Sequence, residues 1–168
     1  MPTIRPATAT DIPELHALIE LAYRGSIARS GWTHEADILD GPRTDRETLT
    51  AMIADPANTI LLALDGVGIV ACIQVTDRGG GLAYFGQLAV MPGRQADGLG
   101  RRMIAAAETH ARSFGATRIE GTVIDRRDEL IAYYGRCGFT ATGEIRPFPY
   151  AKPISGPPLT LVVLAKPL

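Results

Sequence analysis

Glycines and arginines between residues 88 and 102 are the residue types in this sequence best suited to bind an anion. Gly98 and Gly100 open an amphipathic segment, and Arg94, Arg101 and Arg102 surround them. The first turn of a helix leaves backbone N–H groups without intrahelical partners, and its dipole adds about half a positive charge there. Because Gly98 and Gly100 lack side chains, a diphosphate could approach those N–H groups, and the arginines would add charge-assisted hydrogen bonds.

Three alternatives exist for this loop. A P-loop requires lysine and a hydroxyl residue after its second glycine, but Leu99 and Gly100 stand there, which excludes nucleoside triphosphate chemistry. A dinucleotide-binding fingerprint requires a third glycine where Met103 stands, although Glu120 is suitably distant for a ribose-binding acid. A helix that merely begins after a turn would explain either glycine alone, but not both glycines together with three arginines.

The sequence resembles the GNAT superfamily of acetyltransferases at two motifs. Residues 95–100, Gln-Ala-Asp-Gly-Leu-Gly, match the family's signature of Gln or Arg, two residues, Gly, one residue, and Gly or Ala. Residues 133–139, Tyr-Tyr-Gly-Arg-Cys-Gly-Phe, match its second signature, an aromatic-tyrosine pair followed after three residues by Gly-Phe. The resemblance runs from Ile4 to Leu164 and implies an α/β fold, a mixed sheet of about seven strands flanked by about four helices. In that fold the fourth and fifth strands splay apart, and coenzyme A lies between them.

The resemblance also implies roles for individual residues. The backbone of Leu88, Ala89 and Val90 would hold the pantetheine arm and the acyl carbonyl, with the Val90 N–H as the oxyanion donor. The pyrophosphate would be held by Gln95, Ala96, Asp97, Gly98, Leu99, Gly100 and Arg101. Tyr134 aligns with the tyrosine that protonates the departing coenzyme A thiolate in many members of the family. The alternative for Tyr134 is a half-buried core aromatic beside Tyr133.

Some positions depart from the family pattern. Asp97 stands where a basic residue is common, and Arg127 stands seven residues before Tyr134, where an asparagine usually bonds the pantetheine. The fourth strand lacks the customary carboxylate base. The remaining candidates for that base are Glu35, Glu120, Asp125 and a chain of water molecules.

The acceptor pocket is expected between the segment after the first helix and the connection of the last two strands. Its expected residues are Trp32, Glu35, Tyr84, Phe148 and Tyr150. An aromatic ring beside a carboxylate suits an ammonium or amine acceptor through cation–π and ionic contacts. Packing in the core is the alternative for Trp32. The three histidines lie on different elements without ligand spacing, so no metal site is predicted.

Length, charge and cysteine content limit the number of domains, the kinds of partner and the cellular compartment that can be expected. A chain of 168 residues is long enough for one domain, expected over residues 1–168. A net charge of −1, with 21% of residues charged, predicts neither a nucleic-acid face nor a disordered tail. The two cysteines lack CxxC spacing, which favours buried free thiols in a reducing compartment. Without an apolar leader or a run of about 18 apolar residues, a cytoplasmic protein that does not contact a membrane is expected.

Hydrophobic periodicity and punctuation predict the elements that must position these residues. Helices are expected from Asp11 to the residue before Gly25, and over Glu47–Ala54, Gly98–Phe114 and Asp128–Arg136, with residues 26–45 irregular. Strands are expected at Ile4 and over Thr59–Leu64, Gly68–Thr76, Leu82–Val90, Arg118–Ile124, Phe139–Glu144 and Leu159–Leu164. Asp11 and Glu14 are predicted to form a capping box. The succession of strand, helix, strand and helix predicts a parallel crossover.

The sequence therefore predicts an N-acetyltransferase that moves an acetyl group from acetyl-CoA to a primary amine. The acceptor would be a small molecule or a peptide, attacked directly in a ternary complex, and the family often forms homodimers. A non-catalytic module that senses acyl-CoA is the alternative, favoured by the missing carboxylate on the fourth strand. Nucleic-acid binding is disfavoured by a pI near 6.3 and by the lack of a basic stripe.

Overall fold

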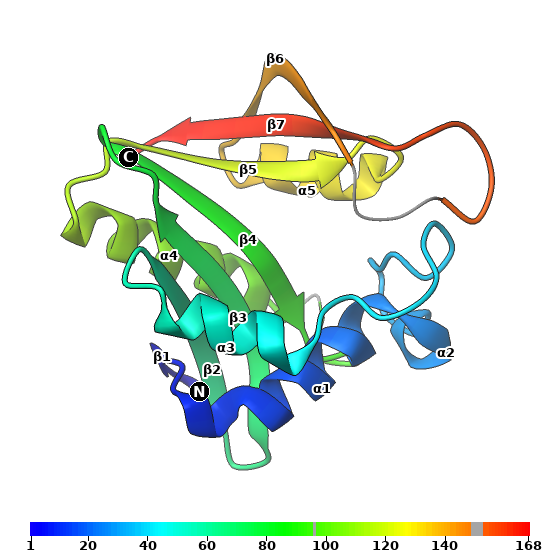
Figure 1. Ribbon diagram of the computed structural model, residues 1–168, viewed down its shortest axis with the longest axis horizontal. Coiled ribbons are helices and arrows are strands. Elements are labelled where there is room, and N and C mark those ends of the chain that lie inside the picture. Colours follow the sequence, from blue (N-terminus) through cyan, green and yellow to red (C-terminus); the bar gives the residue numbers. More distant parts are fainter. Residues whose placement is uncertain (96, 149–152) are drawn as a thin grey trace.

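Seven strands form one mixed sheet in the order β1-β2-β3-β4-β5-β7-β6 (Figure 1). The computed structural model describes residues 1–95, 97–148 and 153–168. The strands are β1 (Thr3–Pro6), β2 (Asn58–Asp65), β3 (Gly68–Asp77), β4 (Leu82–Val90), β5 (Arg118–Ile124), β6 (Thr140–Pro147) and β7 (Thr160–Pro167). The helices are η1 (Ala9–Asp11, a 3₁₀ turn), α1 (Ile12–Tyr23), α2 (Gly25–Ala28), α3 (Arg46–Ala54), α4 (Leu99–Ser113) and α5 (Asp128–Arg136). Neighbouring strands are antiparallel except β4 and β5, which are parallel, as the crossover pattern predicts.

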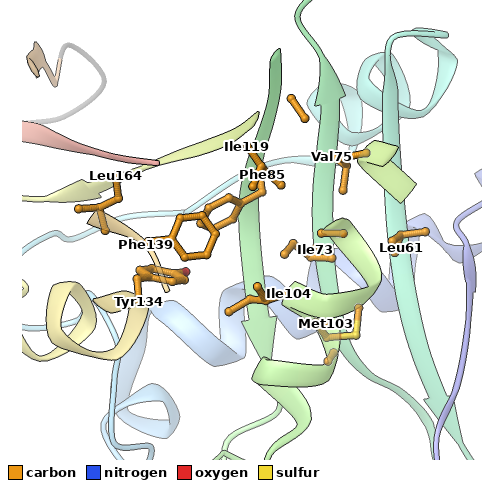
Figure 2. Packing of buried hydrophobic residues seen from close by; sticks show 14 of the residues in the cluster. Leu61, Ile73, Val75, Phe85, Met103, Ile104, Ile119, Tyr134, Phe139 and Leu164 are labelled. Atoms are coloured by element: carbon orange, nitrogen blue, oxygen red, sulfur yellow. The ribbon is translucent and has the colours of Figure 1, made fainter. Parts of the chain in front are cut away.

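Helices cover both faces of the sheet because successive residues of a strand point to opposite sides. In β2, Leu61 and Ala63 belong to the hydrophobic cluster under α4 and α5, whereas Ile60 and Leu62 belong to the cluster under α1 and α3. Figure 2 shows the first cluster, in which Met103 of α4 lies over the sheet. The expected α/β architecture is confirmed.

Two local predictions are wrong. The segment expected to be irregular begins with the short helix α2, which brings the α-helices of the described residues to five. Asp11 accepts a hydrogen bond from the backbone N–H of Thr8 at 2.8 Å, so the capping interaction lies one turn earlier than the predicted box. The carboxylate of Glu14 instead accepts the backbone N–H of Ile69 at 2.7 Å, which ties α1 to the start of β3.

The sheet divides between β4 and β5. These strands pair only over Leu82–Tyr84 and Arg118–Glu120, although β4 continues to Val90, and Figure 1 shows them diverging beyond the paired ends. A register shift of β4 against β3 occurs near the same place, and Gln87 has a φ of 49°. Positive φ is uncommon for a residue other than glycine, and an irregular residue of this kind bends a strand. The predicted splay of the fourth and fifth strands is confirmed.

The two cysteines differ in how deeply they are buried. Cys72 is fully buried and free, as predicted, but Cys137 is only partly buried, so the expectation of two buried thiols is half right. Burial raises the pKa of Cys72 to about 12, which keeps that thiol protonated and inert.

Across the described parts of the chain, no helix has both the length and the apolarity to span a bilayer.

Candidate active site

A cavity of about 350 Å³ lies where β4 and β5 separate. Its walls come from the last residues of β4, the loop into α4, the helix α5 and the segment that follows α1. The volume is within the range of about 300–1,000 Å³ that is usual for small-molecule sites. Elements more than 60 residues apart in the sequence therefore meet around one candidate site.

The end of β4 supplies backbone groups to this cavity, as expected for Leu88, Ala89 and Val90, all three of which line it. Val90 is opposite Ala71 of β3, and the next residue, Met91, donates its N–H to the Val70 carbonyl at 2.9 Å. Because hydrogen-bonded and non-hydrogen-bonded pairs alternate along an antiparallel ladder, the Val90 N–H and carbonyl point away from β3. They point into the gap that β5 leaves open.

The other edge of the cavity is the start of α4. Gly98 is the N-cap of this helix, with a φ of 77° that a side chain would strain, and Gly100 lies in the first turn. Both glycines line the cavity together with Gln95 and Arg101. The predicted anion loop therefore borders the same cavity as the end of β4.

Other members of the predicted loop have different surroundings. Leu99 is 4% exposed and packs in the core. Asp97 is largely exposed, with a carboxylate oxygen 3.7 Å from Arg94 Nε. Ala96 lies outside the described residues. Gln95 contributes its side chain, since its Nε2 donates to the carbonyls of Val90 and Thr33, each at 3.4 Å.

The three arginines predicted to assist this loop do not act together. Arg94 binds Asp65 at 2.7 Å, and Arg102 donates to the backbone carbonyl of Pro2 at 3.0 Å. Only Arg101 lines the cavity. Arg136 of α5 also lines it; this residue was not predicted, although it lies within the second motif.

Tyr134 lines the cavity and is also a core residue, 5% exposed. Its ring centroid lies 5.3 Å from that of Phe85 and 5.9 Å from that of Phe139, and Figure 2 shows the three rings together. Burial raises the pKa of Tyr134 well above its ordinary value of 10. The phenol therefore holds its proton at neutral pH while it faces the cavity.

Tyr23, at the end of α1, is a cavity residue that was not predicted from the sequence. Its hydroxyl donates a hydrogen bond to the backbone carbonyl of Leu88. Burial raises the pKa of Tyr23 to about 12, so this donor keeps its proton. The available signal was helical spacing, because Tyr23 follows the buried Leu15 and Ile19 at intervals of four residues.

Trp32 lines the cavity as expected, with its ring centroid 5.3 Å from that of Tyr133. Trp32 is 42% exposed, so the alternative prediction that its side chain packs in the core is wrong. Tyr84 does not line the cavity: it is the last residue of β4 that pairs with β5, and its hydroxyl lies 3.1 Å from Thr122 Oγ1. Phe148 packs against a separate small cluster that includes Leu39, and Tyr150 lies outside the described residues.

Glu35 is buried beneath three arginines and does not line the cavity. Its carboxylate lies 2.9 Å from Arg24, 2.9 Å from Arg43 and 3.4 Å from Arg127. Burial alone would raise the pKa of Glu35, but Arg43 and Arg127, with a hydrogen bond from Arg24, outweigh it and lower that pKa. The expected pairing of Glu35 with Trp32 around an ammonium is therefore corrected, because the carboxylate is already neutralised.

The other candidate bases are also engaged elsewhere. Glu120 binds Arg146 at 3.0 Å, and Asp125 accepts a hydrogen bond from Thr160 Oγ1 at 3.0 Å. Among the described residues that line the cavity there is no Asp or Glu, and within the same ranges no cluster of His, Cys, Asp and Glu could hold a metal ion.

Acidification should remove the stabilisation that Glu35 provides. Because its pKa in the folded state lies below the ordinary value of about 4.3, this contribution is complete above that pH and is lost as the pH falls through the lowered pKa. In the Glu35→Gln variant, the free energy of unfolding should therefore fall less steeply with pH below about 4, by up to about 1.4 kcal/mol per pH unit.

Urea titrations across the acid range measure this slope. The matched control is Asp37→Asn, which removes a surface carboxylate, 70% exposed, beside Arg29. The control should follow the wild type. If Glu35→Gln also kept the wild-type slope, the three arginines would not be holding an ionised Glu35.

A mixed sheet that opens between β4 and β5, with a glycine-bearing helix start at the opening, defines the acyl-CoA N-acyltransferase fold. Residues 15–139 match the model of the Acetyltransferase (GNAT) family. The chain therefore belongs to this family of acetyltransferases. No match was found among curated protein sequences.

Solved structures show the same fold at low sequence identity. A ribosomal-protein-alanine N-acetyltransferase from Brucella melitensis is 19% identical, with a TM-score of 0.75 and 99% of each chain covered. A GNAT family acetyltransferase from Elizabethkingia anophelis, with acetyl-CoA bound, is 19% identical, with a TM-score of 0.74, 99% of this chain covered and 98% of that one. An IAA acetyltransferase from Bacillus cereus is 15% identical, with a TM-score of 0.72 and full coverage of both chains.

Proposed function

We propose that the protein transfers an acetyl group from acetyl-CoA to a primary amine by direct attack in a ternary complex. The observation that carries this proposal is that one cavity brings together the end of β4, the start of α4 and the Tyr134 side chain. In this proposal the end of β4 supplies a backbone donor for an oxyanion, the start of α4 binds phosphates, and Tyr134 is a protonated acid.

The start of α4 fits the diphosphate of acetyl-CoA. An alanine-like Cβ at Gly98 would meet no atom within 4 Å, so the space over this end of the helix is open. The free N–H groups of the first turn and the positive end of the helix dipole favour an anion there. Arg101 and Arg136 add positive charge at the same edge of the cavity.

The end of β4 fits the thioester. The Val90 N–H points into the gap and would donate to the thioester oxygen, where negative charge develops during attack. The hydroxyl of Tyr23 orients the neighbouring Leu88 carbonyl, and the Gln95 amide donates to the Val90 carbonyl. These contacts hold the strand end rigid without occupying the Val90 N–H.

Tyr134 would donate its proton to the departing sulfur. Because burial raises its pKa, the phenol is protonated throughout the physiological range and can act as a general acid. The free thiol has a pKa of about 8.5, so protonation of the thiolate makes it a better leaving group.

The amine must be neutral when it attacks, and the described cavity lining offers no carboxylate to remove its proton. Three arginines line the cavity: Arg101, Arg127 and Arg136. Positive charge nearby disfavours a second cation and so lowers the pKa of a bound ammonium. The local field would thereby assist deprotonation by water.

Thiol release from acetyl-CoA in the presence of a panel of primary amines tests this proposal, with binding of acetyl-CoA followed in parallel by calorimetry. Binding together with turnover of about 1 s⁻¹ or more with at least one amine is the expected result. Binding without turnover across the panel would contradict the proposal and favour an acyl-CoA sensor. Absence of binding would remove the basis for both.

A further inference from the structure

Among the residues that the structure describes, the arginines around Glu35 outnumber the carboxylates that they contact. Arg24, Arg43 and Arg127 all contact this one carboxylate, and their side chains are 11%, 25% and 3% exposed. The second carboxylate within reach, that of Glu129, lies 3.8 Å from Arg127 Nε and is 47% exposed. A buried excess of positive charge is costly unless an anion balances it.

This positive cluster extends to the wall of the cavity. Arg127 and Tyr23 line it, and the guanidinium carbons of Arg43 and Arg127 lie 4.8 Å and 5.7 Å from the centroid of the Tyr23 ring. The hydroxyl of the same tyrosine bonds to Leu88 at the end of β4. Arg127 is also close enough to Tyr134 for its charge to oppose the effect of burial on the pKa of that phenol.

Arg127 has bonding capacity left over. Its Nη2 donates to Thr33 Oγ1 at 2.6 Å and its Nη1 to Glu35 at 3.4 Å. Its Nε is buried and has no hydrogen-bond partner in the part of the chain that the structure describes. Each Nη nitrogen carries two N–H groups, and only one of each pair has a hydrogen-bond partner among the described residues. Because Arg127 also lines the cavity, these remaining donors are the ones available to an anion bound there.

We propose that the acceptor is a free α-amino acid and that Arg127 binds its carboxylate. This inference rests on the proposed function and specifies its substrate class. The planar guanidinium fork matches a carboxylate better than any other common anion-binding side chain does. The amino group of such a molecule, two bonds from the carboxylate, would lie toward Val90 and Tyr134, while Trp32 and Leu130 offer apolar contact to its side chain.

The positive cluster also disfavours acceptors without an acidic group. A polyamine would bring additional cations next to Arg127 and Arg43, where like charges repel. The phosphates of acetyl-CoA have their own arginines, since Arg136 stacks near Tyr133 at 5.9 Å and Arg101 lies in the first turn of α4. Arg127 is therefore left for the acceptor.

Matched acceptors test this inference on the unmodified protein. Each set contains an amino acid, its amide and the amine that lacks the carboxylate, for example leucine, leucinamide and isoamylamine, with spermidine added. The amino acid should have a kcat/KM about 10- to 100-fold above that of its amide, the range for one hydrogen bond to a charged group. Equal use of acid and amide, or a preference for spermidine, overturns the inference while the proposed function stands.

Variants then assign the preference to Arg127. Arg127→Lys keeps the charge but loses the fork, and Arg127→Gln loses both, so the ratio of kcat/KM between acid and amide should fall in that order. The matched control is Arg112→Gln, on the exposed face of α4, whose side chain is 52% exposed; it should keep the wild-type ratio.

Two results with these variants overturn the inference. One is an unchanged acid-to-amide ratio. The other is a rise in the KM for acetyl-CoA alone, which would assign Arg127 to the pantetheine instead. If neither Arg127 variant folds, the acceptor comparison on the wild type decides the matter. Calorimetric binding of acetyl-CoA without turnover of any acceptor would refute the proposed function and this inference together.

Discussion

Replacing Tyr134 by phenylalanine is expected to lower kcat by about 100-fold or more, with little change in the affinity for acetyl-CoA. The substitution removes only the hydroxyl that would protonate the departing sulfur. The phenylalanine ring keeps the packing against Phe85 and Phe139, so the fold should be retained. Steady-state thiol release measures kcat, and calorimetry measures the binding of acetyl-CoA.

The matched control for this substitution is Tyr84→Phe. Tyr84 lies on the paired part of β4, where its hydroxyl contacts Thr122 outside the cavity, so kcat should stay within about threefold of the wild type. A loss of less than about tenfold in Tyr134→Phe would show that this phenol is not the acid. The raised pKa of Tyr134 adds a second expectation, because kcat of the wild type should not decline through loss of this proton below about pH 10.

Replacing Gly100 by valine is expected to weaken the binding of acetyl-CoA by on the order of 1,000-fold, the loss of about two hydrogen bonds to a charged group. A Cβ at this position would lie 2.9 Å from the Tyr133 hydroxyl, and the further methyl groups would reach into the cavity. The side chain would thus displace the phosphates from the N–H groups of α4. Calorimetric titration of the folded variant with acetyl-CoA gives the change in affinity.

Gly135→Ala is the matched glycine replacement. Gly135 lies in α5, and a Cβ there would meet no atom within 4 Å. Affinity for acetyl-CoA should be unchanged, and the free energy of unfolding should rise by about 0.5 kcal/mol because alanine loses less backbone entropy in a helix. If Gly100→Val bound acetyl-CoA as tightly as this control, the start of α4 would not be the phosphate site.

Most of the fold could be predicted from the sequence because its signals are local. The bounds of β4, β5 and α5 agree with the hydrophobic pattern, and the splay of β4 from β5 agrees with the two-motif resemblance. The bounds of the elements depend on residues within a few positions of one another, such as the turn at Gly98 or the spacing of Leu130 and Tyr134 in α5. The splay is a long-range feature that followed from the family resemblance alone.

The short helix α2 and the displaced capping interaction were not predictable to the same degree. Helix α2 has only four residues, too few to show a period. Glu14 had the spacing of a capping residue, but a backbone N–H of β3, more than 50 residues away, competes for its carboxylate. A local motif predicts a contact only where no distant partner is better placed.

The electrostatics of the site could not be predicted, for the same reason. From its residue type, Glu35 was assigned to an amine, yet its partner Arg127 is 92 residues away and joins it only when β5 and α5 meet the segment after α1. Arg94 and Arg102 adjoin the phosphate loop in the sequence but bind Asp65 and Pro2 in space. Residue types and local spacing thus determined the elements of the fold and the glycine-bearing start of α4. Charge pairing depends on distances through space, so only long-range packing set the sign of the charge around Glu35 and Arg127 beside the cavity.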